Sequence, residues 1–365
     1  MSLLSLPTEL LCILPDYINN IESFTSLAST CRTLRTIFNA THPRTILRLA
    51  DSSAPTFFSP HPHFLITATA QSISDWALGN EERTAALRKA FHGGIYSFYN
   101  LILNHGTLTL DRIREMYNAR FEIINPLSDK LDKIAGNQWM ATPQFWQGGV
   151  SEPATLHTDA DRAAFQILIY GELFKSSMDA FLNPELNLPS FDIDTRLDYL
   201  KFTLADEHEP NDYERGETNA SYAYYQDMDS LRHIVLCGRW RRVWGEAIKK
   251  HLDGGFGEQD GDGDGAGWRG RLLRDALMVQ GVRGMELVTK KGKAAVDDEG
   301  FASGGGDDAE REWEYLGRAR SIQERIRALE RPPGLREYGT RREMKISHAP
   351  DLSGEMDVVI MLMQW

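Results

Sequence analysis

Apolar residues recur at helical spacing through roughly the first 250 positions of this 365-residue chain, whereas runs of alternating apolar and polar residues are scarce. The first pattern is typical of helices that bury one face, and the second of half-buried strands. Residues 161–181 are apolar nearly all round, as expected of a buried helix, and this pattern ends near Asn183-Pro184. A composition of 42% hydrophobic and 25% charged residues supplies material for a large core. We therefore predict a mainly α fold.

Two segments rich in Gly and charged residues interrupt the C-terminal half of the chain. Residues 254–267 are almost entirely Gly, Asp, Glu and Gln, and residues 290–308 are rich in Gly, Lys and Asp, which predicts flexible insertions. We expect three short N-terminal helices followed by a larger helical domain with these Gly/Asp-rich insertions. The predicted boundaries are 1–45, 46–253, 254–309 for the insertions around a helix at about 268–288, and 310–365 for a C-terminal helix and tail packed on the helical domain.

A long amphipathic helix is predicted over residues 221–251. Trp240 and Trp244 share one face, and Arg242 and Lys249 lie on the other. Cations interleaved with aromatic residues also occur in proteins that bind single-stranded nucleic acids. Because the tryptophans and the charges separate onto opposite faces, we favour core packing beneath a hydrated basic face.

The chain is acidic, with 40 Lys and Arg against 52 Asp and Glu and a formal net charge of −12. It lacks the global basic character of proteins that bind nucleic acid or anionic membranes, and we predict neither as a partner. No basic residue precedes Arg32, so we expect no secretory signal peptide. The longest apolar stretch elsewhere, Val358–Met363, is far below the roughly 20 residues that cross a bilayer. We expect a protein of the cytoplasm or the nucleus.

The sequence motifs of common enzymes and metal proteins are missing. No Gly-x-Ser-x-Gly, His-Glu-x-x-His or phosphate-binding Gly-Lys-Ser/Thr sequence occurs, and the three cysteines form no Cys-x-x-Cys pair. Asp260, Asp262 and Asp264 imitate a calcium loop, but Arg271 stands at its twelfth position, where a bidentate Glu is required. We predict no catalytic residue, no cofactor and no metal site, and hence a protein that is not an enzyme.

Two clusters that contain histidine are better explained by structural roles than by metal binding or acid–base catalysis. His61 and His63 are expected to be a surface-loop pair, because no third ligand lies at metal-binding spacing. His157, Asp159 and Asp161 precede the helix at 161–181, where Asp is an ordinary capping residue. We therefore expect helix capping at these positions.

The pattern of the N-terminal residues predicts three short helices. Pro7 suits a first helical turn, Glu9 places a negative charge at the positive helix end, and one apolar face is formed by Leu10, Leu14, Tyr17 and Ile18. Such a small unit cannot bury enough surface to be stable alone, so we expect it to dock on the rest of the chain, on a partner, or on both. After a break at Asn19-Asn20 the pattern continues with Glu22 or Ser23 as a cap, with Phe24, Leu27, Ala28 and Cys31 on a second helix, and with Leu34, Ile37 and Phe38 on a third.

These residues resemble a known motif. The run Leu6-Pro7-Thr8-Glu9-Leu10-Leu11, followed by Tyr17-Ile18, Leu27, Thr30-Cys31-Arg32 and Leu34-Arg35, is similar to the F-box. Through this motif the substrate receptors of Skp–cullin–F-box ubiquitin ligases bind the Skp adaptor. The Thr-Cys-Arg sequence and the following Thr45-Ile46-Leu47-Arg48-Leu49 resemble the fungal F-box proteins in particular. The resemblance covers residues 3 to about 40, and residues 1–45 are the predicted F-box.

The resemblance implies an adaptor-binding role for nine residues. They match the Leu-Pro pair that inserts into the adaptor, the first contacting helix with its aliphatic seam, and positions on the later helices. One position departs from the family pattern, since Pro15 stands where a helix former is usual, removes the hydrogen bond to the Leu11 carbonyl and should kink the helix. The predicted partner-binding residues are Leu6, Pro7, Glu9, Leu10, Leu14, Ile18, Leu27, Cys31 and Leu34.

The function implied by the resemblance is that of a substrate receptor in ubiquitin-dependent degradation. Its partners would be the Skp adaptor, cullin through that adaptor, and an unknown protein substrate. No leucine-rich, WD or kelch period occurs, so the sequence does not identify the substrate. Two alternatives stay open: a helical ligand-binding or enzymatic domain whose N-terminal helices are only structural, and an F-box scaffold that acts outside a ligase.

Overall fold

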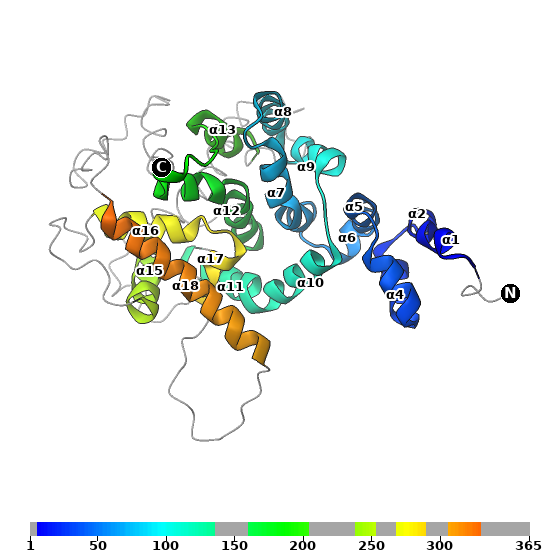
Figure 1. Cartoon of the computed structure of the whole chain (residues 1–365). Coiled ribbons are helices and arrows are strands. Elements are labelled where there is room, and N and C mark those ends of the chain that lie inside the picture. The colour runs from blue at the N-terminus through cyan, green and yellow to red at the C-terminus, as the bar shows by residue number, and fades with distance from the viewer. Residues whose placement is uncertain (1–5, 136–159, 204–237, 253–267, 290–305, 330–365) are drawn as a thin grey trace, which may run out of the picture. The chain divides into compact units, whose positions relative to one another are not determined.

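The computed structural model describes residues 6–135, 160–203, 238–252, 268–289 and 306–329 (Figure 1). Within these ranges the regular structure is helical and no strand occurs, which confirms the mainly α prediction. No helix in the same ranges is long and apolar enough to cross a membrane. The predicted insertion at 254–267, residues 290–305 of the predicted insertion at 290–308, Asp260, Asp262 and Asp264, His157, Asp159 and the C-terminal tail lie outside the described residues. Residues 306–308, which we predicted to belong to the second insertion, are the first residues of helix α18 (Gly306–Ala328).

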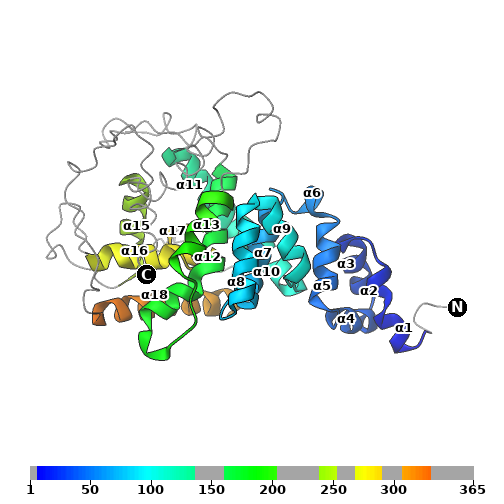
Figure 2. The same ribbon diagram turned by 90° about the horizontal axis from the view of Figure 1, so that it is seen from above.

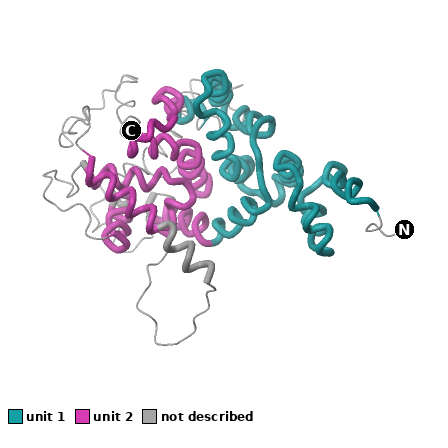
Figure 3. The backbone as a smooth tube through the Cα atoms, viewed as in Figure 1, with its two compact units in different colours: residues 1–121, 198–223 teal, residues 122–197, 224–365 magenta. Residues whose placement is uncertain are grey.

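The chain divides into two compact units, which Figure 3 colours separately. Unit 1 comprises residues 1–121 and 198–223, and unit 2 comprises residues 122–197 and 224–365. The boundary that we predicted at residue 45 therefore does not separate compact units. The reason is α5 (Pro43–Asp51), which packs both on the N-terminal helix α3 (Ile21–Thr30) and on α9 (Gly94–His105).

Four helices replace the three predicted at the N-terminus. They are α1 (Thr8–Cys12), α2 (Leu14–Tyr17), α3 and α4 (Arg32–Asn39). The first predicted helix is split because Pro15 lies in the first turn of a new helix that begins at Leu14, where a missing N–H group costs no hydrogen bond. The α3 cap is Asn20, whose side chain accepts a hydrogen bond from the Ser23 amide at 2.8 Å, so neither Glu22 nor Ser23 is the cap that we expected.

The rest of unit 1 is a helical array closed by a segment from later in the chain. Phe91 and Phe98 contact the ring of Tyr199 edge-on at centroid distances of 5.4 and 6.5 Å. Asp198 accepts a hydrogen bond from Arg88 at 2.6 Å and lies 3.1 Å from His92. These contacts hold the π-helical turn Tyr199–Thr203 in place. The helices are α5, α6 (Ala54–Phe57), α7 (His63–Ala77), α8 (Glu81–His92), α9 and α10 (Leu110–Ala119).

Unit 2 is built around the long helix α12 (Ala160–Leu182). Residues 163–174 are all buried, which confirms the prediction of a helix that is apolar nearly all round. The helices of this unit are α11 (Asn125–Ala135), α12, α13 (Ile193–Asp198), α15 (Gly238–His251), α16 (Trp268–Met278), α17 (Val282–Thr289) and α18 (Gly306–Ala328).

Helix α15 has the two predicted faces. Trp240 and Trp244 are fully buried and their rings meet edge-on at 6.0 Å, whereas Arg242 and Lys249 are exposed. This arrangement confirms core packing by the tryptophans. The part of the predicted helix before Gly238 lies outside the described residues.

The single helix predicted at about 268–288 is wrong, because the chain turns between α16 and α17. Gly281 has a φ of +68°, which residues with a Cβ rarely adopt. Both helices bury most of their side chains and belong to the core of unit 2. Their apolar pattern continues across the turn, which is why periodicity alone did not reveal it.

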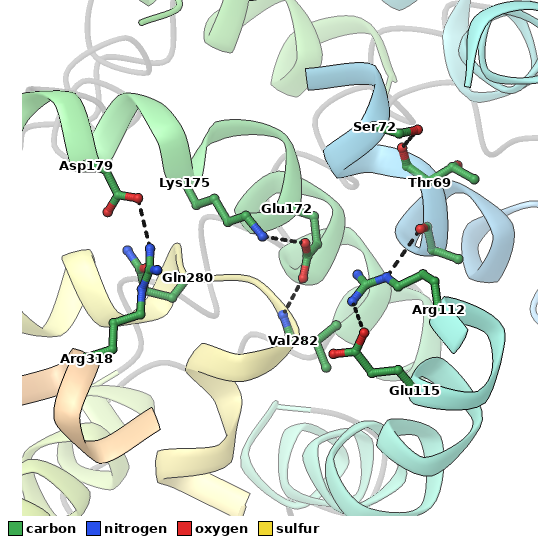
Figure 4. Close-up of polar contacts among 11 residues, drawn as sticks. Thr69, Ser72, Arg112, Glu115, Glu172, Lys175, Asp179, Gln280, Val282 and Arg318 are labelled. Atoms are coloured by element: carbon green, nitrogen blue, oxygen red, sulfur yellow. Dashed lines mark hydrogen bonds and ion pairs between the residues drawn. The ribbon is translucent and has the colours of Figure 1, made fainter. Parts of the chain in front are cut away.

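Glu172 links α12 to this turn. Its carboxylate is buried and accepts hydrogen bonds from the Val282 amide, at the start of α17, at 3.1 Å and from Lys175 at 3.0 Å (Figure 4). A negative charge at a helix N-terminus is stabilised by the amides and the helix dipole there. Arg318 of α18 donates to Gln280 and Asp179 at 2.9 Å each. Polar contacts from two helices therefore fix the turn.

We expect Gly171→Ala to destabilise unit 2. An added Cβ at Gly171 would lie 2.5 Å from the backbone nitrogen of Gly281 and 2.7 Å from its Cα, and this backbone cannot move aside without displacing the turn. The free energy of unfolding should fall by about 1–3 kcal/mol, as for other overpacked cores. Urea denaturation followed by circular dichroism measures it.

Gly245→Ala is the matched control for this substitution. Gly245 lies within α15 and an added Cβ would meet no atom within 4 Å. Alanine should therefore leave stability unchanged or raise it by up to about 1 kcal/mol. If Gly171→Ala were equally harmless, the close approach of α12 to the turn would be contradicted.

Candidate functional site

Large apolar side chains are exposed along the outer side of α1 and α2. Leu10 is 47% exposed, Ile13 44% and Tyr17 75%. Their spacing of three and four residues is that of one face of a continuous helix, and here the three residues are distributed over α1, α2 and the residue between them. We call Leu10, Ile13 and Tyr17 the N-terminal apolar face.

This face lies outside a small but complete core. Phe24 of α3 and Phe38 of α4 are fully buried and stack with ring centroids 4.8 Å apart. Leu11 and Leu34 are also buried, at 2% and 3% exposure, and α1 packs on α4. The short helices therefore use their inner side chains for packing, and the exposed apolar residues are not needed to complete the core.

The nine predicted partner-binding residues fall into three groups in the structure. Leu34 is a core residue and is not accessible to a partner. Cys31 lies between α3 and α4 in extended backbone, so it is not on the second helix as predicted. Pro7, Glu9 and Leu10 are exposed, whereas Leu6, Leu14, Ile18, Leu27 and Cys31 are half-buried.

Two members of the apolar face were not among the predicted partner-binding residues. Ile13 follows the last residue of α1 and Tyr17 ends α2, and both are more exposed than Leu14, which we had predicted. Tyr17 was already part of the apolar face that we predicted for this segment, and helical spacing from Leu10 would also have identified Ile13. The sequence could not show that the Leu14 side would turn inward, because this depends on packing against the other helices.

The kink expected at Pro15 is present as a full break between α1 and α2. Ile13 separates the two helices, and Pro15 itself is buried. Because a proline lacks the amide that would continue α1, α2 is left as a separate helix of four residues.

His61 and His63 do not form the surface-loop pair that we predicted. His63 is 2% exposed as the first residue of α7, and the half-buried His61 ring meets Tyr99 edge-on at 5.2 Å. The Tyr99 hydroxyl donates a 2.6 Å hydrogen bond to Asp51. No group of three metal-ligating side chains occurs in the described parts of the chain.

Burial sets the protonation of this cluster. Removal from water lowers the pKa of His61, although the nearby Asp51 carboxylate opposes the shift and His63 adds to it. Burial and the hydrogen bond to Asp51 raise the pKa of Tyr99. His61 is therefore held neutral and packed against an aromatic ring.

Asp161 is placed close to its predicted role. It lies in the first turn of α12, where a negative charge is favourable, and its carboxylate accepts a hydrogen bond from the Ser128 hydroxyl of α11. It thus stabilises the start of α12 from within the helix and links it to α11.

We expect the stability of unit 1 to fall as the pH drops below about 6.5, the usual pKa of histidine. The folded state lowers the pKa of His61, so the unfolded state binds more protons in this range. The stabilisation that His61 contributes is complete above the pKa of His61 in the unfolded state. It is lost as the pH falls from there through the lower pKa of His61 in the folded state. Urea denaturation at a series of pH values measures the effect.

The variant His61→Phe separates this contribution from those of other groups. Phenylalanine can keep the edge-on contact with Tyr99 but binds no proton. The variant should lose less stability than the wild type over the same pH interval. Identical pH profiles for the two proteins would contradict the assignment.

Comparisons with known proteins do not identify a function for this site. No protein-family model, no curated protein and no solved structure matches this chain. The resemblance of the N-terminal residues to the F-box therefore remains a prediction. The function has to be argued from the exposed apolar face and the helices that carry it.

Proposed function

We propose that the N-terminal apolar face binds the Skp adaptor and that the chain is a substrate receptor of a Skp–cullin–F-box ubiquitin ligase. The observation that carries the proposal is the exposure of three large apolar side chains, Leu10, Ile13 and Tyr17, within eight consecutive residues. Exposed apolar residues that cluster rather than scatter singly are typical of protein–protein interaction sites. It coincides with the segment that resembles the F-box, in which the first helix contacts the adaptor.

The arrangement of the core supports an external partner for this face. A helix that merely completed the fold would bury its apolar residues, as α3 and α4 do with Phe24 and Phe38. Complete transfer of a Leu or Ile side chain out of water is favourable by about 1.5–3 kcal/mol, before the costs of association are subtracted. The three exposed side chains together thus offer a substantial part of a specific binding energy.

In this role the protein would act through proximity and would not itself be a catalyst. One part of the chain holds the adaptor, another captures the substrate, and other subunits transfer ubiquitin. The substrate's effective concentration near the ligase then sets the rate of its modification.

Leu10→Asp should abolish adaptor binding without unfolding the protein. The Leu10 side chain is 47% exposed in the free chain, so a carboxylate can stay hydrated there, whereas burial against a partner would strip its water. We expect at least a hundred-fold loss of affinity, about 3 kcal/mol. Co-expression with the adaptor followed by size-exclusion chromatography measures complex formation.

Tyr96→Asp is the matched control, because Tyr96 is a 55% exposed apolar residue of unit 1 that lies on α9. This variant should bind the adaptor like the wild type, and both variants should unfold at the wild-type temperature. A wild-type chain that is folded but forms no complex, or a Leu10→Asp variant that still forms one, would refute the proposal.

A further inference from the structure

Helix α5, which follows the predicted F-box, has a polar stripe as well as an apolar one. Ile46, Leu47, Leu49 and Ala50 are buried and attach the helix to its neighbours. The stripe consists of Thr45, Arg48 and Ser52, at the spacing of one helical face, and all three donate hydrogen bonds to the segment that contains α2 and its C-terminal end. Figure 2 shows α5 beside α3, the helix that this segment leads into.

Arg48 makes the central contact of this stripe. Its Nη2 atom lies 3.1 Å from the carbonyl oxygen of Pro15, 3.4 Å from that of Asp16 and 3.3 Å from that of Ile18. One amino group has two hydrogens, so at least one hydrogen is shared between two acceptors. Hydrogen bonds from a guanidinium are charge-assisted and stronger than those between neutral groups.

Two of these carbonyl groups, those of Pro15 and Asp16, belong to α2, and the third, that of Ile18, follows its last residue. The last carbonyl groups of any helix lack partners within the helix, and they carry a partial negative charge. Helix α2 has four residues and no basic residue in its last turn, and helices this short are not stable alone. Arg48 supplies from another helix the cation that α2 lacks.

Neighbouring contacts fix the rest of the corner between α2 and α3. The Thr45 hydroxyl donates to the Asp16 carboxylate at 3.3 Å, and Ser52 donates to the carbonyl of Asn19. Just beyond the stripe, Ser53 donates to the Glu22 carboxylate at 3.1 Å. The backbone from residue 15 to residue 22 is therefore tied to residues 45–53 at several points.

We propose that Arg48 is a positioning residue for adaptor docking. It holds the end of α2, and with it Tyr17, in one orientation relative to Leu10 before a partner arrives. The adaptor does not have to order the face on binding, which preserves affinity and association rate. The adaptor-binding unit thus extends through residue 53, and this inference rests on the proposed function.

The test compares three variants of the full chain. Arg48→Met keeps much of the side-chain length but removes every donor, and Arg48→Lys keeps the charge but not the planar guanidinium. Arg44→Met removes the same charge one helical turn earlier on α5, from a residue that is exposed like Arg48. Adaptor affinity and association rate are measured by biolayer interferometry. Amide hydrogen exchange of residues 15–22 in the free proteins reports whether the corner is held.

Arg48→Met should weaken adaptor binding at least ten-fold, mainly through slower association, and should speed exchange at residues 15–22 while exchange in α7 and α9 stays unchanged. Arg48→Lys should recover part of both losses, and Arg44→Met should behave like the wild type. Unaltered adaptor affinity in Arg48→Met would overturn the positioning role alone. Equal losses in Arg44→Met would also overturn it, since charge and not the carbonyl contacts would then be responsible.

The proposed function fails in a different way. If the wild-type chain binds no adaptor, the face is not an adaptor site, and the positioning role is rejected with it. Arg48→Met could also speed amide exchange throughout unit 1, which would mean that Arg48 supports the whole unit. The proposal would then be retained only if Arg48→Lys recovers part of the adaptor binding without recovering the slow exchange of the unit. Absence of that recovery would reject it.

Discussion

The packing of α5 decides how the N-terminal helices are held. Its apolar side chains are at most 3% exposed, and the helix contacts α3 on one side and α9 on the other. Helices α1 to α4 have ten residues or fewer, and peptides of this length do not stay helical in water. Their order therefore depends on burial against α5 and against one another. Because the inner side chains are used for that burial, the outer face of α1 and α2 keeps its exposed apolar residues.

Pro15 and Arg48 have complementary effects on this face. The proline ends α1 early and leaves a four-residue helix whose carbonyl groups need partners from elsewhere. The guanidinium of Arg48 provides them from a position 33 residues away in the sequence. The departure from the F-box pattern that we noted in the sequence is thus accompanied by a contact that limits its effect. Neither residue belongs to the apolar face, yet both determine how that face is presented.

Local periodicity explains which parts of the fold could be predicted. Periodicity identified α12, α15 and α18, because the apolar pattern of each helix is long enough to be recognised in the sequence without information on the segments that pack against it. It failed at Gly281, where the pattern continues through a turn. The boundary at residue 45 came from the resemblance to the F-box, and unit 1 continues past it because α5 also contacts α9. The exposure of Ile13 and Tyr17 and the burial of His63 depend on distant packing partners. At the candidate site the sequence predicted short helices and an apolar face with Leu10, but neither the split of the first helix into α1 and α2 nor the contacts of Arg48.

The place of Tyr199 in unit 1 has a consequence for the order in which the chain can mature on the ribosome. Its ring is fully buried against Phe91 and Phe98, so the interior of unit 1 cannot be complete until residue 199 has been synthesised. Helices α11 and α12, which belong to unit 2, are synthesised before residue 199 and leave the ribosome ahead of it. Domains usually fold one after another from the N-terminus as they leave the ribosome. In this protein a part of the second unit leaves the ribosome before the first unit can be closed.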